Sequence, residues 1–402
     1  MNLLFVCHQR RFKADLRPGR LARFLAERGH HVTLLCIADH AKFRMKKYMQ
    51  DGVCFIETPD LLFGSLRSGW DPASVLRRRT MLGKLGVFDL VHVFETRPAT
   101  IYPVLRFLKK HPAPLVIDWI DWWGRGGIIT TNRPKWYQVL FGPFETFYEE
   151  HYRTLANATT VICTALGHRA EGLGVHPDSI FKVPIGADTE AIPFVDPATH
   201  RSAFDFLETD RIALFSAMDA VMDVELVFSA AKRVHAVCPE FKLVMTGNGA
   251  ERLTQQAKAF GIGDFFVHLG RLPQEQFVEA LTCADVFLLP FADEIYNRGR
   301  WPCKIGDYLA AGRPIVSNPV GEVRELMQKH QVGILTDFDS DKFAEGIKNV
   351  LEDLDQSRSM GQNARHVAEN ELAWDGILDE LEHAYGYAMK KHQKVVGLGS
   401  GH

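Results

Sequence analysis

The chain has 402 residues, of which 46% are apolar and 24% are charged, and its formal net charge is −2. This composition excludes a disordered or fibrous chain, and the length exceeds that of one ordinary hydrophobic core, so we expect two domains. No apolar run reaches the roughly 18–20 residues that a membrane-spanning helix needs.

In the first half of the chain, short apolar runs alternate with helical patterns, which is typical of βαβ units in parallel sheets. The first run begins almost at Met1, with no basic segment or cleavage site of a signal peptide before it. We expect strands at Leu3–Cys7, His31–Ile37, Val53–Ile56, Leu90–Phe94, Leu115–Asp118 and Thr160–Cys163. The first domain is therefore expected to be a doubly wound α/β unit.

The second half repeats this alternation after an irregular segment, 184–205, which Pro184, Pro193 and Pro197 interrupt. Further strands are expected at Ile212–Ser216, Lys242–Thr246, Phe265–Leu269, Val286–Pro290, Pro314–Ser317 and Val332–Leu335. From Asp339 to about Lys391 the pattern is helical. The expected fold class is α/β, with two Rossmann-like doubly wound domains that face each other across a cleft, since ligands bind at the carboxyl ends of such strands.

The most informative segment runs from Gly299 to Asn318, where the sequence predicts a loop, a helix opened by Pro302, a stop at Gly312 and a buried strand. Lys304 and Asp307 lie near the helix N-terminus, whose free N–H groups attract anions. A cation, a carboxylate and a positive helix end suit a ligand with phosphate and hydroxyl groups, such as a sugar nucleotide. An ordinary surface Lys–Asp pair is the alternative interpretation.

This segment resembles the donor site of retaining glycosyltransferases of family 4, whose pattern is Pro-x-Lys-(apolar)-x-Glu-Tyr-(apolar)-Ala-x-Gly-x-Pro-(apolar)-Val. Gly312 and Pro314 match the spacing of the pattern. Asp307 stands where the family has the glutamate that binds the nucleotide ribose. The resemblance implies the GT-B fold and a nucleotide diphosphate-sugar as donor.

The resemblance also divides the chain into parts. It implies an acceptor-side domain at 1–190 and a nucleotide-sugar donor domain at 191–372. The remaining residues, 373–402, are expected to form a helix around Trp374–Met389 that crosses back to the first domain, followed by a frayed tail.

A helix opens after the first predicted strand with Gly19 and Arg20. The family has a glycine pair at this point, which lets backbone amides approach the donor phosphate. Only the first glycine is present here, so the match is partial. We expect Gly19 and Arg20 to contribute to donor binding.

Acidic and aromatic residues follow a buried strand of the first domain, in the segment Asp118-Trp-Ile-Asp-Trp-Trp-Gly. It is similar to the His-Asp site of the family, although Ile120 replaces the histidine that contacts the transferred sugar. We expect Asp121 to act in catalysis, and Asp118, Trp122 and Trp123 to bind the acceptor through hydroxyl contacts and ring stacking. An aspartate cap with core tryptophans is the alternative interpretation.

In the second domain, Thr246-Gly-Asn-Gly ends a strand and opens a helix, similar to the family's Gly-x-Gly turn beneath the nucleotide. Thr246, Gly247 and Gly249 are therefore expected to bind the donor. Arg271 or Leu272 follows the next strand, where the family's backbone reads the base.

Two departures from the family pattern concern the diphosphate. The family's Arg and Lys after the first strand of the second domain are Ala217 and Met222 here, and its first glutamate is Gly299. Cations are needed in this place because negative charge develops on the departing oxygen. We expect three basic residues to replace them, Arg298, Arg300 and Lys304, and Arg20 of the first domain is the alternative.

The resemblance implies a retaining, metal-independent glycosyltransferase without a cofactor, with Asp121, Arg300 and Lys304 in catalysis. The acidic segment Asp337-x-Asp339-x-Asp341 lies at a predicted helix start, where capping explains the acids. Two alternatives stay open, a non-catalytic relative that binds nucleotide-sugars and a sugar-nucleotide 2-epimerase.

Charge is distributed unevenly, since residues 1–190 hold 26 Lys and Arg against 18 Asp and Glu, whereas the rest carries a net charge of −10. A positive first domain suits peripheral contact with an anionic membrane surface, or a lipid-linked or envelope polysaccharide acceptor, and solvated surface charge is the alternative. No nucleic-acid motif accompanies the charge, so no nucleic acid partner is expected. The seven scattered cysteines favour a cytoplasmic protein, at the inner face of the membrane if peripheral.

Overall fold

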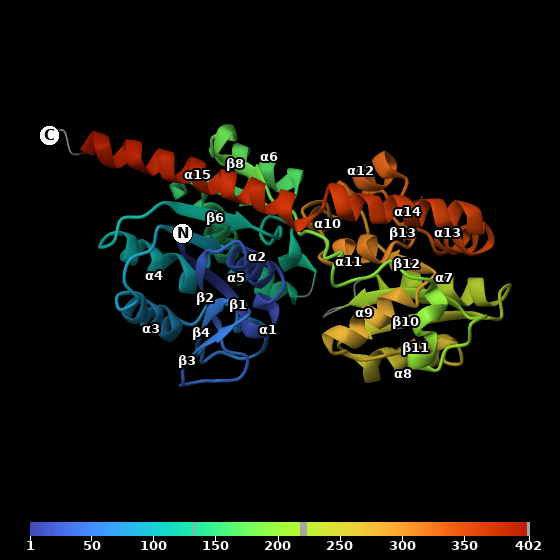
Figure 1. Ribbon diagram of the computed structural model, residues 1–402. Helices are drawn as coiled ribbons and strands as arrows, with labels where there is room; N and C mark the ends of the chain where they lie inside the picture. Colours follow the sequence, from blue (N-terminus) through green and yellow to red (C-terminus); the bar gives the residue numbers. More distant parts are fainter. Residues whose placement is uncertain (132, 218–222, 400–402) are drawn as a thin grey trace. The chain divides into compact units, whose positions relative to one another are not determined.

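The computed structural model describes residues 1–131, 133–217 and 223–399. The chain divides into two compact units (Figure 1). Unit 1 comprises Met1–Ile185 and the chain from Asp375 onward, and unit 2 comprises Gly186–Trp374. The first border falls at the start of the proline-interrupted segment 184–205.

Unit 1 is built on an eight-stranded sheet in the order β3-β4-β2-β1-β5-β6-β7-β8. Its strands are β1 (Asn2–Arg10), β2 (His31–Ile37), β3 (Lys46–Gln50), β4 (Val53–Thr58), β5 (Leu90–Phe94), β6 (Leu115–Trp119), β7 (Ala158–Val161) and β8 (Ile180–Lys182). β3 pairs with β4 antiparallel, and the other neighbouring strands are parallel. The strand order reverses between β1 and β5, and ligands bind at the carboxyl ends of strands at such a point.

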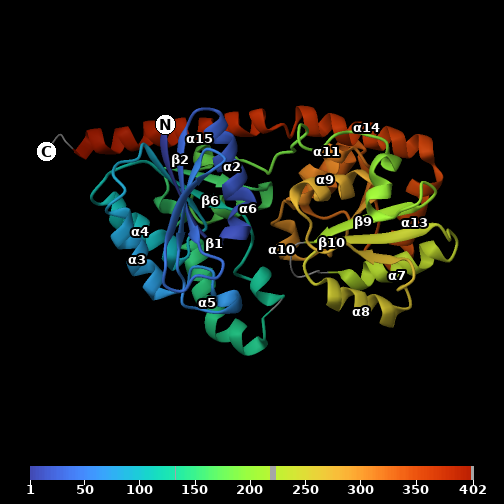
Figure 2. The same cartoon turned by 60° about the horizontal axis from the view of Figure 1, so that its bottom comes forward.

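Helices cover both faces of this sheet (Figures 1 and 2). They are α1 (Arg11–Ala14), α2 (Arg17–Glu27), α3 (Pro72–Leu82), α4 (Pro98–Leu108), α5 (Lys135–Glu150), α6 (Thr164–Gly172) and α15 (Trp374–Gly399), with 3-10 turns η1 (Gly64–Leu66), η2 (Ile128–Thr130), η3 (Arg153–Leu155) and η4 (Pro177–Ser179). Because side chains alternate along a strand, Leu4 and Val6 of β1 pack with Ile101 and Val104 of α4 in one core cluster.

The last helix, α15, packs on unit 1. Arg28 at the end of α2 donates hydrogen bonds to Asp379 (2.7 Å) and Glu382 (3.0 Å). The buried Tyr385 hydroxyl lies 2.9 Å from Nδ1 of His92 in β5. The helix begins at Trp374, as predicted, and continues to Gly399, past the expected end at Met389.

Unit 2 has a six-stranded parallel sheet in the order β11-β10-β9-β12-β13-β14. The strands are β9 (Arg211–Ala217), β10 (Phe241–Gly247), β11 (Phe266–His268), β12 (Val286–Leu289), β13 (Ile315–Ser317) and β14 (Gly333–Leu335). The order reverses between β9 and β12, so their carboxyl ends mark the ligand position of this doubly wound sheet.

The helices of unit 2 are η5 (Pro197–Phe204), α7 (Val224–His235), α8 (Ala250–Phe260), α9 (Gln274–Thr282), α10 (Ile295–Arg298), α11 (Lys304–Ala311), α12 (Gly321–His330), α13 (Ser340–Glu352) and α14 (Leu354–Asn370). Phe215 and Leu243 of the sheet pack with Val227 of α7 and Phe343 of α13 in one buried cluster. The carboxylate of Asp339 accepts hydrogen bonds from the backbone N–H groups of Asp341 and Lys342 in the first turn of α13, which confirms the capping interpretation.

The predicted α/β class is confirmed, and each of the twelve predicted strands is present with ends shifted by a few residues. Two strands were not predicted. β3 has the sequence Lys-Lys-Tyr-Met-Gln and lies exposed at the sheet edge, so it lacks an apolar run. β8 spans only three residues. α11 begins at Lys304, two residues after the predicted start at Pro302.

Candidate functional site

In unit 2, the predicted cation Lys304 lies at the reversal point of the sheet. It is the first residue of α11, and its Nζ lies 4.4 Å from the centroid of the Phe215 ring in β9. Burial, followed by the nearby charge of Arg300, lowers the pKa of Lys304 to about 7. A bound anion would reverse this shift, because it favours the charged ammonium.

Arg300 precedes Lys304 and lies beside the start of α7. Its Nη1 donates a hydrogen bond of 3.2 Å to Oδ1 of Asn297. Burial raises the pKa of Asp223, the residue before α7, while the backbone of Ala292 and the charge of Arg300 act in the opposite direction. The segments that follow β9 and β12 therefore carry both cations and a carboxylate at the reversal point.

α11 is fixed to the sheet by its buried side. The Tyr308 hydroxyl accepts a hydrogen bond of 2.9 Å from the backbone N–H of Ser216, and its ring stacks on Phe287 at 3.9 Å. Gly306 is required by close packing, because a Cβ there would lie 2.5 Å from the carbonyl oxygen of Gly186. Asp307 is 6% exposed on the same helix, one turn after Lys304.

The predicted Thr246 turn lies at the carboxyl end of β10, next to β9. Gly247 donates a backbone hydrogen bond of 2.7 Å to Gly270, and Gly249 has a φ of +85°, which favours glycine. Thr246 is 2% exposed, and its hydroxyl has no hydrogen-bond partner among the residues that the structure describes. A buried unsatisfied hydroxyl calls for an explanation, and a bound ligand is one.

The other predicted donor residues lie farther out. Arg298 is exposed and makes a bidentate ion pair with Asp293 at 2.7 and 2.9 Å. Arg271 is exposed and Leu272 is half-buried after β11. Ala217 is the last residue of β9, and Met222 lies outside the described residues.

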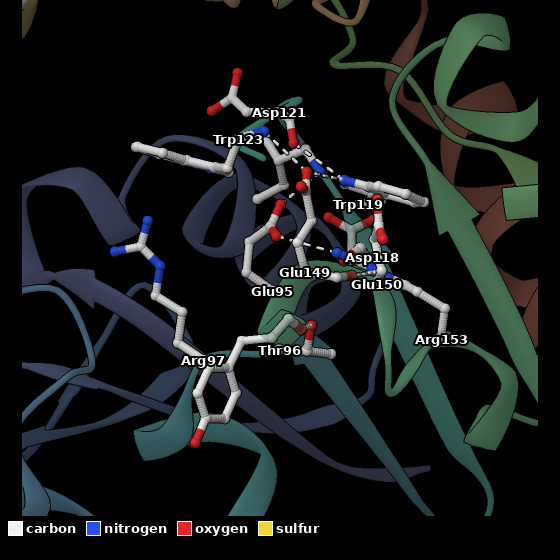
Figure 3. A network of polar contacts seen from close by, with 12 residues as sticks. Glu95, Thr96, Arg97, Asp118, Trp119, Asp121, Trp123, Glu149, Glu150 and Arg153 are labelled. Carbon is white, nitrogen blue, oxygen red and sulfur yellow. Dashed lines mark hydrogen bonds and ion pairs between the residues drawn. The ribbon is translucent and has the colours of Figure 1, made fainter. Parts of the chain in front are cut away.

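In unit 1, a network of polar side chains lies at the carboxyl ends of β5 and β6 (Figure 3). Glu95 follows β5 with a φ of +63° and accepts hydrogen bonds from the N–H of Ile120 (2.9 Å) and from Arg153 (3.1 Å). Burial raises the pKa of Glu95 to about 7, against the lowering effect of Arg153.

Glu149 of α5 holds the segment that follows β6. Its carboxylate accepts hydrogen bonds from the indole of Trp119 (3.1 Å) and from the backbone N–H groups of Trp123 (2.8 Å) and Gly124 (2.6 Å). Arg169 donates two further bonds, of 3.0 and 3.1 Å. The candidate acceptor segment 121–124 is thus positioned by a buried carboxylate on a helix.

The predicted acceptor residues lie in different surroundings. Asp118 is fully buried and accepts two hydrogen bonds of 2.8 Å from Arg17. Burial acts to raise the pKa of Asp118, but the ion pair with Arg17 more than offsets this, so the pKa is lowered. This pair ties β6 to α2 and explains Asp118 without an acceptor.

The neighbouring side chains are more accessible. Asp121, Trp122 and Trp123 are all half-buried. The guanidinium of Arg169 lies 4.2 Å from the ring centroid of Trp122, and that of Arg97 lies 4.6 Å from Trp123. The indole N–H of Trp122 is buried without a hydrogen-bond partner among the described residues, so a ligand hydroxyl or carbonyl would satisfy it.

The two predicted residues of α2 have a packing role of their own. A Cβ on Gly19 would lie 2.7 Å from the carbonyl oxygen of Ala14, so the close turn from α1 into α2 requires a glycine. Arg20 is half-buried on the first turn of α2.

Sequence reasoning did not single out Glu95, Arg97 or Glu149. Glu95 and Arg97 follow a predicted buried strand directly, and this position was the available signal, because the ends of parallel strands share one edge of the sheet. Glu149 lies on a helix and has no such signal. Within the described part of the chain, no group of three or more His, Cys, Asp or Glu residues is arranged to hold a metal ion.

The fold and these two polar regions point to one class of protein, the glycosyltransferases. Residues 16–186 match the family model "Glycosyl transferase 4-like domain", and residues 198–367 match "Glycosyl transferases group 1". One model therefore covers most of the N-terminal part of unit 1, and the other covers most of unit 2.

One curated relative is the GDP-mannose-dependent monoacylated alpha-(1-6)-phosphatidylinositol monomannoside mannosyltransferase of Corynebacterium glutamicum. The two are 25% identical over 219 residues, which is 52% of this chain and 56% of the relative. The chain spans about half the length of the curated relatives it matches first.

Solved structures show the same fold. Sucrose-phosphate synthase from Thermosynechococcus elongatus superimposes with a TM-score of 0.75 and 16% identity, covering 96% of this chain and 98% of that one. Anabaena HepE in complex with UDP and glucose gives a TM-score of 0.71 and 16% identity, over 96% and 99% of the chains. The expected GT-B fold is thereby confirmed for the two units.

Proposed function

We propose that this protein transfers a sugar from a nucleotide diphosphate-sugar to an acceptor, with retention of anomeric configuration and without a metal. The carrying observation is the pair Lys304 and Arg300 at the reversal point of unit 2, with Asp307 one turn further along α11. Both family models and the curated mannosyltransferase support this class of reaction, and the UDP complex of HepE supports a nucleotide-sugar donor.

In this proposal Lys304 and Arg300 bind the diphosphate and stabilise the charge that develops on the leaving oxygen. The N-terminus of α11 adds the positive end of its helix dipole to the same anion site. Asp307 binds the ribose hydroxyls, and the unsatisfied hydroxyl of Thr246 donates to the nucleotide. Lys304 is suited to this role because burial leaves its ammonium poorly solvated, which lowers its pKa to about 7, and a bound anion would stabilise the charged form.

On the acceptor side, Asp121 orients the attacking hydroxyl, and Trp122 and Trp123 provide ring surfaces for a sugar. The buried indole N–H of Trp122 supports a polar ligand at this place. The acceptor class that we propose is a lipid-linked or envelope saccharide, in keeping with the phosphatidylinositol-containing acceptor in the name of the Corynebacterium relative.

The donor site is tested by the affinity of UDP and GDP for the wild-type chain, Lys304→Ala and Asp307→Ala, measured by titration calorimetry. We expect each variant to lose at least about tenfold in affinity for the preferred nucleotide, since a charge-assisted contact is removed. Lys342→Ala is the matched control, because this exposed lysine of unit 2 pairs with Glu345 on α13. Affinities unchanged in both site variants would contradict the proposed site.

One observation favours a second candidate, a relative that binds nucleotide-sugars without catalysis. Ala217 stands where the resembling family has a phosphate-binding arginine, and the carboxylate of Asp223 lies near Arg300. Such a protein would bind the nucleotide and release no sugar from any donor, whereas an enzyme releases the nucleoside diphosphate.

A further inference from the structure

Helix α5 has its polar side turned into unit 1 and its apolar side turned out. Its buried side chains are Tyr137, Glu145 and Glu149. Six large apolar side chains between 44% and 74% exposed form what we call the α5 stripe: Trp136, Val139, Leu140, Phe141, Phe144 and Phe147. Their spacing of three and four residues places most of them along one side of the helix.

The inverted orientation follows from the contacts that the polar side makes. Glu149 must face inward because it holds the backbone of residues 123 and 124 and pairs with Arg169. The Tyr137 hydroxyl donates a hydrogen bond of 3.1 Å to Glu145. Since these three positions fix the rotation of the helix, the remaining apolar positions are left at the surface. Large exposed apolar side chains gathered along one side of a helix are typical of an interaction surface.

Basic residues border the α5 stripe. The Tyr102 hydroxyl of α4 lies 2.8 Å from that of Tyr148 in α5, which joins the two helices. Arg106, Lys109 and Lys110 follow Tyr102 at helical spacings of four, seven and eight, and all three are exposed. Arg106 lies in α4, and Lys109 and Lys110 follow its end at Leu108, so all three are expected on the side of this helix that meets α5. Lys135 is exposed at the opposite end of α5.

Unit 1 as a whole is also positively charged. It contains 29 Lys and Arg against 20 Asp and Glu, a net charge of +9, whereas unit 2 contains 18 against 29, a net charge of −11. An anionic surface is thus complementary to unit 1. An apolar helix face with tryptophan and phenylalanine, bordered by cations, is typical of a helix that lies in the plane of a membrane interface.

We propose that the α5 stripe, with Arg106, Lys109, Lys110 and Lys135, docks unit 1 on an anionic lipid bilayer. Within the described residues no helix is long and apolar enough to cross a membrane. α5 has 16 residues, fewer than the roughly 20 that span a bilayer, so in this proposal it lies in the plane of the interface. Lipid fits better than a protein partner because the stripe is bordered by exposed cations on the unit that carries the positive net charge, as binding to anionic headgroups requires. The inference goes beyond the proposed transfer reaction and requires neither donor nor acceptor.

The test is co-sedimentation of the full chain with vesicles of pure phosphatidylcholine and of an equal mixture of phosphatidylcholine and phosphatidylglycerol. We expect strong binding to the mixed vesicles only, and at least tenfold weaker binding of Phe144→Glu. Phe338→Glu in unit 2 is the matched control, because its side chain is exposed to a similar extent and should bind like the wild type. Circular dichroism of each variant confirms that it is folded.

A second variant separates charge from apolar contact. Lys109→Ala with Lys110→Ala should lower the affinity for mixed vesicles at least about fivefold and reduce its salt dependence. Lys258→Ala with Lys342→Ala, both exposed in unit 2, is the control and should have no effect. The proposal is overturned if the wild type binds neither vesicle, if Phe144→Glu binds like the wild type, or if light scattering shows a dimer that Phe144→Glu dissociates in the absence of vesicle binding.

Discussion

At the carboxyl edge of the unit 1 sheet, the buried carboxylates of Asp118 and Glu149 each accept several hydrogen bonds, whereas at the same edge of unit 2 the Thr246 hydroxyl has no hydrogen-bond partner among the described residues. Glu149 accepts bonds from an indole, two backbone amides and Arg169. In unit 2, the Thr246 hydroxyl is unsatisfied and the pKa of Lys304 is lowered to about 7. A satisfied network stabilises its unit, whereas an unsatisfied one keeps its binding groups for a ligand.

The largest loss of stability is expected in unit 1, where Glu149 accepts several hydrogen bonds. Glu149→Ala should lower the free energy of unfolding by about 2–6 kcal/mol, because the backbone N–H groups of Trp123 and Gly124 would each lose their acceptor, at about 1–3 kcal/mol apiece. Urea denaturation measures this, with the exposed Glu171 of α6 changed to alanine as the control. A loss below about 1 kcal/mol would mean that the network is not a structural support.

Two buried threonines, Thr160 in unit 1 and Thr246 in unit 2, differ in whether their hydroxyls have hydrogen-bond partners. Thr160 donates a hydrogen bond to Asp118, and its hydroxyl lies 3.2 Å from Nε2 of His92. Thr160→Val should therefore lower the unfolding free energy by about 1–3 kcal/mol. Thr246→Val removes a hydroxyl that has no described partner, so stability should stay within about 0.5 kcal/mol while nucleotide affinity falls severalfold. Equal destabilisation by the two changes would contradict the distinction.

The lowered pKa of Lys304 predicts a pH dependence. The ammonium must be protonated to bind a diphosphate, so above the pKa of about 7 binding takes up a proton and the affinity should fall by about tenfold per pH unit. Between this pKa and the ordinary value of 10.5, the unfolded chain binds more protons than the folded chain, so stability should rise with pH. Lys304→Met should remove both dependences in calorimetric and denaturation measurements.

The smallest effect is expected for Arg298, which the sequence placed in the donor site. Its guanidinium is exposed and already paired with Asp293. Arg298→Ala should leave the midpoint of urea denaturation unchanged and alter nucleotide affinity far less than Lys304→Ala, because an exposed pair contributes little. A loss of affinity as large as that of Lys304→Ala would place Arg298 among the phosphate-binding residues.

The sequence predicted those features that are recorded locally. The buried strands are continuous apolar runs, Gly312 ends α11 with a φ of +65°, and Lys304 lies at the start of that helix. The contacts of Glu149 could not be predicted from the sequence. This residue lies on a helix 26 residues after Trp123, and only tertiary packing brings the two residues together. The ion pair of Asp118 could not be predicted for the same reason, since its partner Arg17 lies 101 residues away in the sequence.

The inverted helix α5 illustrates a further limit. Its apolar residues, among them Leu140 and Phe144, recur at the spacing of three and four that core-facing helices also have. The structure exposes them because Glu145 and Glu149 are required in the interior. Which side of an amphipathic helix faces the core thus depends on partners that the local pattern does not contain.

In the proposed reaction, Lys304 stabilises the departing diphosphate of a sugar nucleotide. The most direct measurement is the release of nucleoside diphosphate from a panel of nucleotide diphosphate-sugars by the wild type, Lys304→Ala and the control Lys342→Ala. We expect release by the wild type and the control from at least one donor, and none above background by Lys304→Ala. Release by Lys304→Ala at the wild-type rate, or binding of a donor by the wild type without release in the presence or absence of acceptors, would contradict this proposal.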